Sequence, residues 1–154
     1  MASPNTEPIF KKIPFKAVVS LSNQVIPRNG GDTTSSALLL VQAGENGLII
    51  ESIQAIPVAT SGTVPTTVLR LFKKGANSTR LTLALPEVQL VSIDSASVND
   101  ATALVTINVP LPDSIQGVLG TKALLLGPNE SLYAALSQSV SPNGYNITVQ
   151  GGFY

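Results

Sequence analysis

The side chains that could do chemistry in this sequence are carboxylates, because the chain contains neither histidine nor cysteine. Paired Asp and Glu side chains can hydrolyse glycosidic bonds, one as the acid and the other as base or nucleophile. Most of the acids lie at predicted turns or strand ends, and no two share a motif. The nine acidic residues of the chain are Glu7, Asp32, Glu45, Glu51, Glu87, Asp94, Asp100, Asp113 and Glu130. We therefore predict that the protein is not an enzyme.

The same composition argues against a bound cofactor or metal. Without His and Cys there are no ligands for the usual zinc, haem or iron–sulfur sites, and no disulfides. Gly30-Gly31 lacks the lysine and the following helix of a phosphate-binding loop. Asp and Asn side chains in loops could in principle bind calcium, but no loop has the spacing of an EF-hand. We expect no cofactor and no metal.

Charge and aromatic content also bear on partners. Nine basic residues balance nine acidic ones, so the net charge is zero and does not attract nucleic acid or an anionic membrane. The few aromatic residues form no stripe beside basic ones, which a single-stranded nucleic-acid site would need. No apolar run is long enough to span a membrane, and residues 1–15 do not read as a secretory signal. Neither nucleic acid nor a membrane is an expected partner.

Glu51 and Arg70 are the two charged residues inside strong strand patterns. Arg70 alternates with Val68 and Phe72, and Glu51 has an isoleucine two residues away on either side. A charge on an otherwise apolar face is costly unless it is paired. Two interpretations follow: Glu51 and Arg70 form a structural ion pair across adjacent strands, or each meets a partner at an interface.

The elements that must position these side chains are strands. Apolar residues recur with a period of two; near the end of the chain, Tyr145, Ile147 and Val149 alternate with polar residues. This is typical of strands with one buried face, which belong to antiparallel sheets. Turn sequences rich in Gly, Asn and Pro separate the runs. The predicted strands are Ala17–Leu21, Ala37–Gln42, Leu48–Ile56, Thr66–Lys74, Arg80–Leu85, Val88–Ile93, Ala103–Val109, Lys122–Leu126, Ser131–Gln138 and Tyr145–Tyr154.

This pattern predicts an all-β fold, an antiparallel β-sandwich of the jelly-roll type. An immunoglobulin-type sandwich is the competing fold, disfavoured because no Trp and no Cys pair would anchor its two sheets. One helical turn could occupy Asp113–Gly120, with Asp113 as its cap. We assign residues 17–154 to the sandwich domain.

Residues 1–16 differ in kind and predict an extended N-terminal arm. They combine prolines and lysines with apolar side chains, and such a segment cannot build its own core. An extended arm would place those side chains on another surface. The alternative is an arm folded back on its own sandwich. The residues predicted to bind a partner are Ile9, Phe10, Lys11, Lys12, Ile13 and Phe15.

The low content of charged residues predicts an assembly. Charged residues make up 12% of the chain, against about a quarter in average globular proteins. Exposed faces must then consist of uncharged polar residues, or they must be covered by other subunits. The alternative is a monomer kept soluble by its Ser and Thr hydroxyls.

Four stretches resemble small jelly-roll proteins of tailed bacteriophages, in particular head decoration (cement) proteins. They are Gly47–Ile53, Val68–Phe72, Leu124–Leu132 and Val149–Tyr154, and the resemblance spans about residues 37–154. The arm lies outside it.

The resemblance implies a virion protein on the outer surface of the capsid, made in the host cytoplasm. It implies a homotrimer that binds across joints between major capsid protein subunits, with no catalytic residues. A tail, baseplate or fibre-head component is the alternative within the virion. A carbohydrate-binding or adhesion module is the alternative from another class, and the absence of Trp counts against it.

Overall fold

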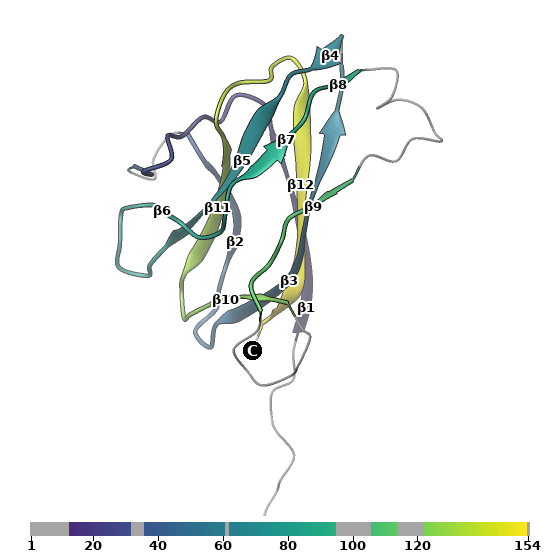
Figure 1. Cartoon of the computed structure of the whole chain (residues 1–154). Helices are drawn as coiled ribbons and strands as arrows, with labels where there is room; N and C mark the ends of the chain where they lie inside the picture. Colours follow the sequence, from purple (N-terminus) through teal and green to yellow (C-terminus); the bar gives the residue numbers. More distant parts are fainter. Residues whose placement is uncertain (1–12, 32–35, 61, 95–105, 114–121, 154) are drawn as a thin grey trace, which may run out of the picture.

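Residues 13–31, 36–60, 62–94, 106–113 and 122–153 are described by the structure, a computed structural model. Most of their strands form two sheets that face each other, β4 and β8 form a separate two-stranded sheet, and within these ranges there is no helix (Figure 1). The strands are β1 (Ile13–Leu21), β2 (Leu38–Gln42), β3 (Leu48–Val58), β4 (Thr63–Val64), β5 (Thr67–Lys74), β6 (Thr82–Leu83), β7 (Val88–Leu90), β8 (Ile93–Asp94), β9 (Ile107–Asn108), β10 (Leu124–Leu126), β11 (Ser131–Leu136) and β12 (Gly144–Phe153).

The strand pairing is that of a jelly roll. The first layer has the order β1-β12-β3-β10, with β9 beside β3; the second has the order β2-β11-β5-β6, with β7 beside β5. Thus early strands pair antiparallel with late ones in nested order: β1 with β12, β2 with β11, β3 with β10, and β5 with β6 and β7. One long hairpin wrapped into two sheets gives this nesting. The predicted all-β jelly-roll sandwich is confirmed.

The main core lies between the two sheets. Ile53 and Ile147 of the first sheet, and Leu71 and Leu132 of the second, are at most 2% exposed and belong to one cluster. Alternation along most of each strand produces this arrangement, because successive side chains point to opposite faces. Burying each such side chain contributes roughly 1.5–3 kcal/mol before conformational entropy is counted.

A second core, formed by Ile26, Phe72, Leu81 and Ala135, lies on the outer side of the β2-β11-β5 sheet. Residues 22–31, which connect β1 to β2, cross this side. The Ile26 amide donates to the Leu136 carbonyl at 3.2 Å, and the Leu136 amide donates to the Gln24 carbonyl at 2.7 Å. Phe72 is therefore completely buried although it points away from the main core.

Gly30 lets residues 22–31 pass close to Leu81. Its φ is +72°, and a Cβ there would lie 2.1 Å from the Leu81 carbonyl oxygen. The Leu81 amide donates to the Gly31 carbonyl at 3.0 Å, which fixes the approach. Only glycine satisfies both the backbone angle and the space.

The observed strand limits differ from the predicted ones at a few places. β1 begins at Ile13 rather than Ala17, because Ile13 to Lys16 pair with the last residues of β12. β4 was not predicted, since a two-residue strand carries no periodic signal. Residues 101–105 of the seventh predicted strand, and the expected helical turn beyond Asp113, lie outside the described residues.

Candidate interaction surface

The six residues predicted to contact a partner divide into two groups. Ile9, Phe10, Lys11 and Lys12 lie outside the described residues. Ile13 and Phe15 lie in β1, which is the edge strand of its sheet.

Ile13 and Phe15 are placed differently along that strand. The Ile13 side chain is 62% exposed. Phe15 is half-buried and packs against Phe153 of its own chain, with ring centroids 5.1 Å apart at 51°. Phe15 thus ties the start of β1 to the end of β12, while Ile13 is open to solvent.

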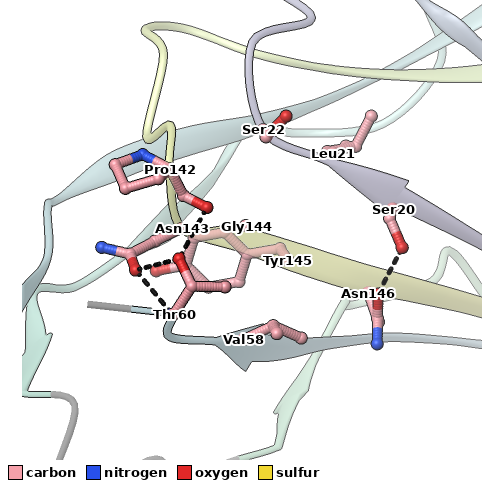
Figure 2. A pocket seen from close by; sticks show the side chains of 10 residues that line it. All are labelled: Ser20, Leu21, Ser22, Val58, Thr60, Pro142, Asn143, Gly144, Tyr145 and Asn146. Carbon is pink, nitrogen blue, oxygen red and sulfur yellow. Dashed lines mark hydrogen bonds between the residues drawn. The ribbon is translucent and has the colours of Figure 1, made fainter.

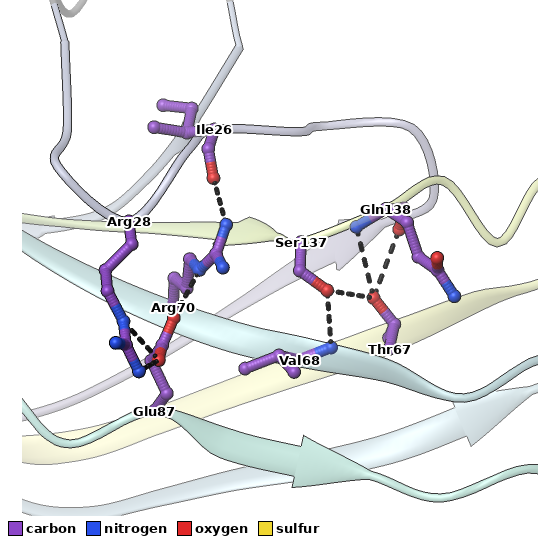
Figure 3. A network of polar contacts seen from close by, with 8 residues as sticks. All are labelled: Ile26, Arg28, Thr67, Val68, Arg70, Glu87, Ser137 and Gln138. Carbon is purple, nitrogen blue, oxygen red and sulfur yellow. Dashed lines mark hydrogen bonds and ion pairs between the residues drawn. The ribbon is translucent and has the colours of Figure 1, made fainter.

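Arg70 forms its ion pair with Glu87, and not with Glu51 (Figure 3). Arg70 Nε lies 2.6 Å from Glu87 Oε1, and its Nη1 donates to the Ile26 carbonyl at 2.7 Å. Glu51 and Arg70 lie on strands of different sheets, β3 and β5. The predicted pairing across adjacent strands is therefore wrong, although a structural ion pair does accommodate Arg70.

Glu87 also accepts from Arg28, whose Nε lies 2.7 Å from Oε2. The hydrogen bonds from Arg28, and then from Arg70, hold the pKa of the Glu87 carboxyl below its ordinary value. The two arginines belong to the 22–31 connection and to β5, so Glu87 joins three separate segments over the second core. These ion pairs and hydrogen bonds hold the 22–31 connection and the segment of Glu87 against β5.

A β-bulge turns Glu51 to the outside. Gln150 pairs with Ser52, whereas the next residue, Gly151, pairs with Ile50, which leaves Glu51 as the extra residue of β3. The bulge reverses the alternation: Ile50 and Ile53 both point into the core, and Glu51 is exposed. The apolar face that the sequence pattern assigned to Glu51 is therefore not continuous.

A shallow hollow of about 180 Å³ lies where β1, β3 and β12 approach one another (Figure 2). None of its lining residues is charged. The buried Asn143 side chain beside it is used internally: Oδ1 accepts from the Thr60 amide at 2.9 Å, and Nδ2 donates to the Thr63 carbonyl at 3.1 Å. Ligand pockets usually measure about 300–1,000 Å³. The hollow thus has neither the size nor the charged groups of a catalytic site.

In the described ranges, no three Asp or Glu side chains are close enough to hold a metal ion together. Lys73 and the Gly127 amide both contact the Glu130 carboxylate at 2.5 Å. Burial alone would raise the pKa of Glu130, but these two contacts outweigh it and lower the pKa. Glu130 therefore stabilises the turn before β11.

The outer side of the β1-β12-β3 sheet carries mostly exposed or half-exposed side chains, and we call it the open face. Three rows of cross-strand neighbours run over it. It consists of Lys16, Val18, Ser20, Glu51, Ser52, Gln54, Ile56, Asn108, Asn146, Thr148 and Gln150.

The open face is nearly uncharged. Lys16 and Glu51 are its charged residues, and apolar Val18 and Ile56 are 54% and 39% exposed. Side-chain hydrogen bonds link neighbouring strands across it: Ser20 Oγ to Asn146 Oδ1 at 2.6 Å, and Gln54 Nε2 to Asn108 Oδ1 at 3.0 Å. The outer side of the other sheet, by contrast, carries the second core and residues 22–31.

Sequence reasoning did not identify the open face as a site. Its members come from three strands far apart in the chain, and each looks like an ordinary polar strand position. A signal was nevertheless present, since the outward positions of β1 and β12 hold Val, Ser, Asn, Thr and Gln with a single Lys. Charged residues normally occupy such positions.

Comparison with known proteins gives distant likenesses. No protein family and no curated protein matches the sequence. Among solved structures, the chain is similar to a chain of the acidic stable capsid structure of the Helicobacter pylori bacteriophage KHP30. The TM-score is 0.47 at 12% identity, over 92% of this chain and 88% of that chain. It is also similar to a chain of the capsid asymmetric unit of cyanophage Pam1. There the TM-score is 0.42 at 14% identity, over 100% of this chain and 93% of that one. Because both scores are low, the fold assignment rests on the strand pairing described above.

Within the described residues, no helix has the length and apolar character needed to cross a lipid bilayer.

Proposed function

We propose that this chain is a structural protein of a bacteriophage virion, and specifically a decoration protein on the outer surface of the head. The observation that carries the proposal is the open face, an outer sheet surface with exposed Val18 and Ile56 and only two charged residues, Lys16 and Glu51. A free monomer of this size normally covers such a surface with Lys and Glu. A protein whose sheet face is covered by neighbouring subunits does not need charged residues on that face.

The role we propose is to clamp neighbouring major capsid protein subunits. A shell presents many copies of one joint, so contacts that are individually weak add up to strong attachment. The jelly roll suits this task because its pairing closes the chain on itself and leaves a rigid body with broad sheet faces. The four stretches that resemble phage decoration proteins support the same role.

We assign the first capsid contact to the N-terminal residues. Ile9 and Phe10 precede β1 in the chain, and Ile13 at its start is 62% exposed. Buried apolar side chains of this kind contribute roughly 25 cal/mol per Å², before the cost of ordering the segment. Lys11 and Lys12 would face an acidic strip of the capsid subunit. The homotrimer implied by the resemblance belongs to this proposal as well.

Electron microscopy of particles of the encoding phage tests the location. Labelled copies should decorate the head at regular positions. Label confined to the tail, baseplate or fibre would contradict the head assignment and favour the alternative virion component.

Binding of the purified protein to undecorated heads tests the clamp. The full chain should co-sediment with heads and raise the temperature at which they rupture. A variant lacking residues 1–12 should fold but bind at least about 10-fold more weakly, since several apolar contacts are lost. Equal binding by both forms would refute the role of the N-terminal residues. Binding to bacterial polysaccharide instead of heads would favour the adhesion module.

A further inference from the structure

We propose that the free edge of β1 binds the same edge of a second copy of this chain. The two β1 strands pair antiparallel, so that the first sheet continues from one copy into the other. The two-fold axis stands perpendicular to the sheet and passes through Val18. This pairing does not rest on the virion role, and it leaves the open face of both copies uncovered. Each proposal can therefore fail while the other stands.

The strand register shows which backbone groups of β1 point outward. The Val109 amide donates to the Ile53 carbonyl at 2.9 Å, so the backbone groups of Ile53 point away from β12. In an antiparallel strand the N–H and C=O of one residue point to the same side, and successive residues alternate. Val149 opposes Ile53 on one side and Ala17 on the other, so Val149 and Ala17 bond to each other. The residues of β1 whose backbone groups point outward are therefore Lys16, Val18 and Ser20.

The outer edge of β1 is long and regular. Among the described strands, β1 is the last of its sheet, and all nine of its residues pair with β12 without a bulge. Natural edge strands are usually shortened, bulged or given inward-pointing charges, because a row of unpaired amides and carbonyls invites another strand. The charge of β1, Lys16, belongs to the open face and does not point into the core. Pro14 has no amide to donate and limits the free edge at its start.

The inward side chains of β1 have a strand beside them on one side. Ala17 and Val19 oppose Val149 and Ile147 of β12, both of which are 0% exposed. Ala17 and Val19 pack against the same core, yet they remain half-exposed. A strand added beyond β1 would cover them, provided that its own inward side chains carry no charge. The edge therefore fits an alternating strand with an apolar inward face.

The β1 strand of a second copy meets this requirement. A two-fold axis through Val18 places Val18 opposite Val18, and Lys16 opposite Ser20 on either side of it. Both residues of each such pair point their backbone groups outward, so each pair exchanges two hydrogen bonds. On the core side, Ala17 opposes Val19 of the second copy, and the two lysines do not oppose each other. This self-complementary placement is the reason to choose a second copy as the occupant.

The pairing also separates the N-terminal segments. Ile13 lies five residues before Val18 in the same strand. At roughly 3.4 Å per residue, the Ile13 residues of the two copies therefore lie about 34 Å apart along the strand direction. If the N-terminal residues bind the capsid as proposed above, one dimer carries two such contacts, and two linked contacts hold more strongly than one.

Charge complementation with sedimentation velocity tests the axis at Val18. The wild-type protein should show a concentration-dependent dimer. Val18→Lys and Val18→Glu should each raise its dissociation constant at least about 10-fold, because each places like charges opposite one another across the axis. An equimolar mixture of the two variants should dimerise with a constant within about threefold of wild type, since opposite charges then meet. Val91→Lys, at a similarly exposed valine outside β1, should leave the dimer unchanged.

An introduced cysteine tests the same contact without adding charge. The chain has no cysteine of its own. Oxidation of Val18→Cys should give a covalent dimer, because opposed residues of a hydrogen-bonded pair have Cα atoms about 5.5 Å apart, within the reach of a disulfide. Val91→Cys should stay monomeric on a denaturing gel under the same conditions. All variants should unfold near the wild-type urea midpoint, since both valines are exposed.

Three results would overturn the pairing. The first is a monomer at every concentration. The second is a dimer that the Val18 variants weaken but that their mixture does not restore. The third is an oligomer, including the trimer, that is insensitive to both charges at Val18. Each of these results leaves the virion proposal standing, because binding to undecorated heads is measured separately.

Discussion

Arg70 Nε lies 2.6 Å from Glu87 Oε1, and this contact joins β5 to the segment between β6 and β7 above the second core. Arg70 also donates to the Ile26 carbonyl, so one guanidinium holds two segments in place. Glu87 is the shared acceptor of Arg70 and Arg28. The arrangement explains how a charge can lie on the same strand face as the buried Phe72.

Glu87→Gln should destabilise the protein in a pH-dependent way. Because hydrogen bonds from Arg28 and then Arg70 lower its pKa in the folded state, the carboxylate stabilises the fold above its unfolded pKa. This contribution is lost as the pH falls through the folded pKa. The difference in unfolding free energy between wild type and variant should therefore be largest near neutrality and shrink below about pH 4.3, the ordinary Glu value. Urea unfolding across this range measures it, and a pH-independent difference would contradict the assignment.

The two arginines should contribute unequally. Arg28 has the larger effect on the pKa of Glu87, but its side chain is 75% exposed, whereas that of Arg70 is 15% exposed. Water screens the exposed pair, so its contribution to stability is small. Arg70→Gln should lower the unfolding free energy more than Arg28→Gln in the same urea series. The reverse order would show that the exposed pair dominates.

The second core should contribute substantially to the free energy of unfolding. Ile26 is 4% exposed against Phe72 and Ala135. Ile26→Ala should cost about 2–4 kcal/mol, the usual range for a buried isoleucine. Val25→Ala, at the adjacent 37%-exposed position, should stay within about 1 kcal/mol of wild type. Hydrogen exchange should accelerate over residues 22–31 in the first variant. Equal costs would mean that the connection does not pack on the sheet.

Gly30 and the adjacent Gly31 provide a matched pair of glycines. A Cβ at Gly30 would meet the Leu81 carbonyl oxygen at a φ of +72°, whereas a Cβ at Gly31 would meet nothing within 4 Å. Gly30→Ala should cost about 2 kcal/mol or more. Gly31→Ala should be close to neutral. Thermal unfolding of the two variants compares them directly, and similar melting temperatures would contradict the close approach.

Local patterns predicted most of the strands because period-two alternation and turn residues are local signals. The limits of β2, β3, β5 and β11 differ from the predicted ones by at most two residues at either end. The nested pairing is that of the jelly roll that the sequence analysis predicted. What alternation could not predict was the second core, since Phe72 on the outer side of β5 is buried by residues distant in sequence.

The surroundings of Glu51 and Arg70 were harder to predict than the strands, because each depends on a contact with a single distant residue. The bulge at Glu51 depends on where Gly151 opposes β3: a Cβ there would lie 1.9 Å from the Ile49 carbonyl oxygen. No periodic pattern in the sequence predicts the close approach of Gly151 to the Ile49 carbonyl oxygen. Likewise, nothing near Glu87 in the sequence indicates Arg70 as its partner, seventeen residues away. The sequence analysis thus placed Glu51 and Arg70 on the correct strands but assigned each of them the wrong neighbouring residues.

Phe15 and Ile13 should separate stability from capsid attachment. Phe15 packs on Phe153, so Phe15→Ala should lower the unfolding free energy by about 1–3 kcal/mol. Ile13 is 62% exposed, and Ile13→Ala should change it by no more than about 0.5 kcal/mol. If Ile13 contacts the capsid as proposed, Ile13→Ala should nevertheless weaken binding to undecorated heads, while exposed Leu39→Ala should not. Loss of stability without loss of binding in Ile13→Ala would place Ile13 in the protein's own packing and remove it from the proposed contact.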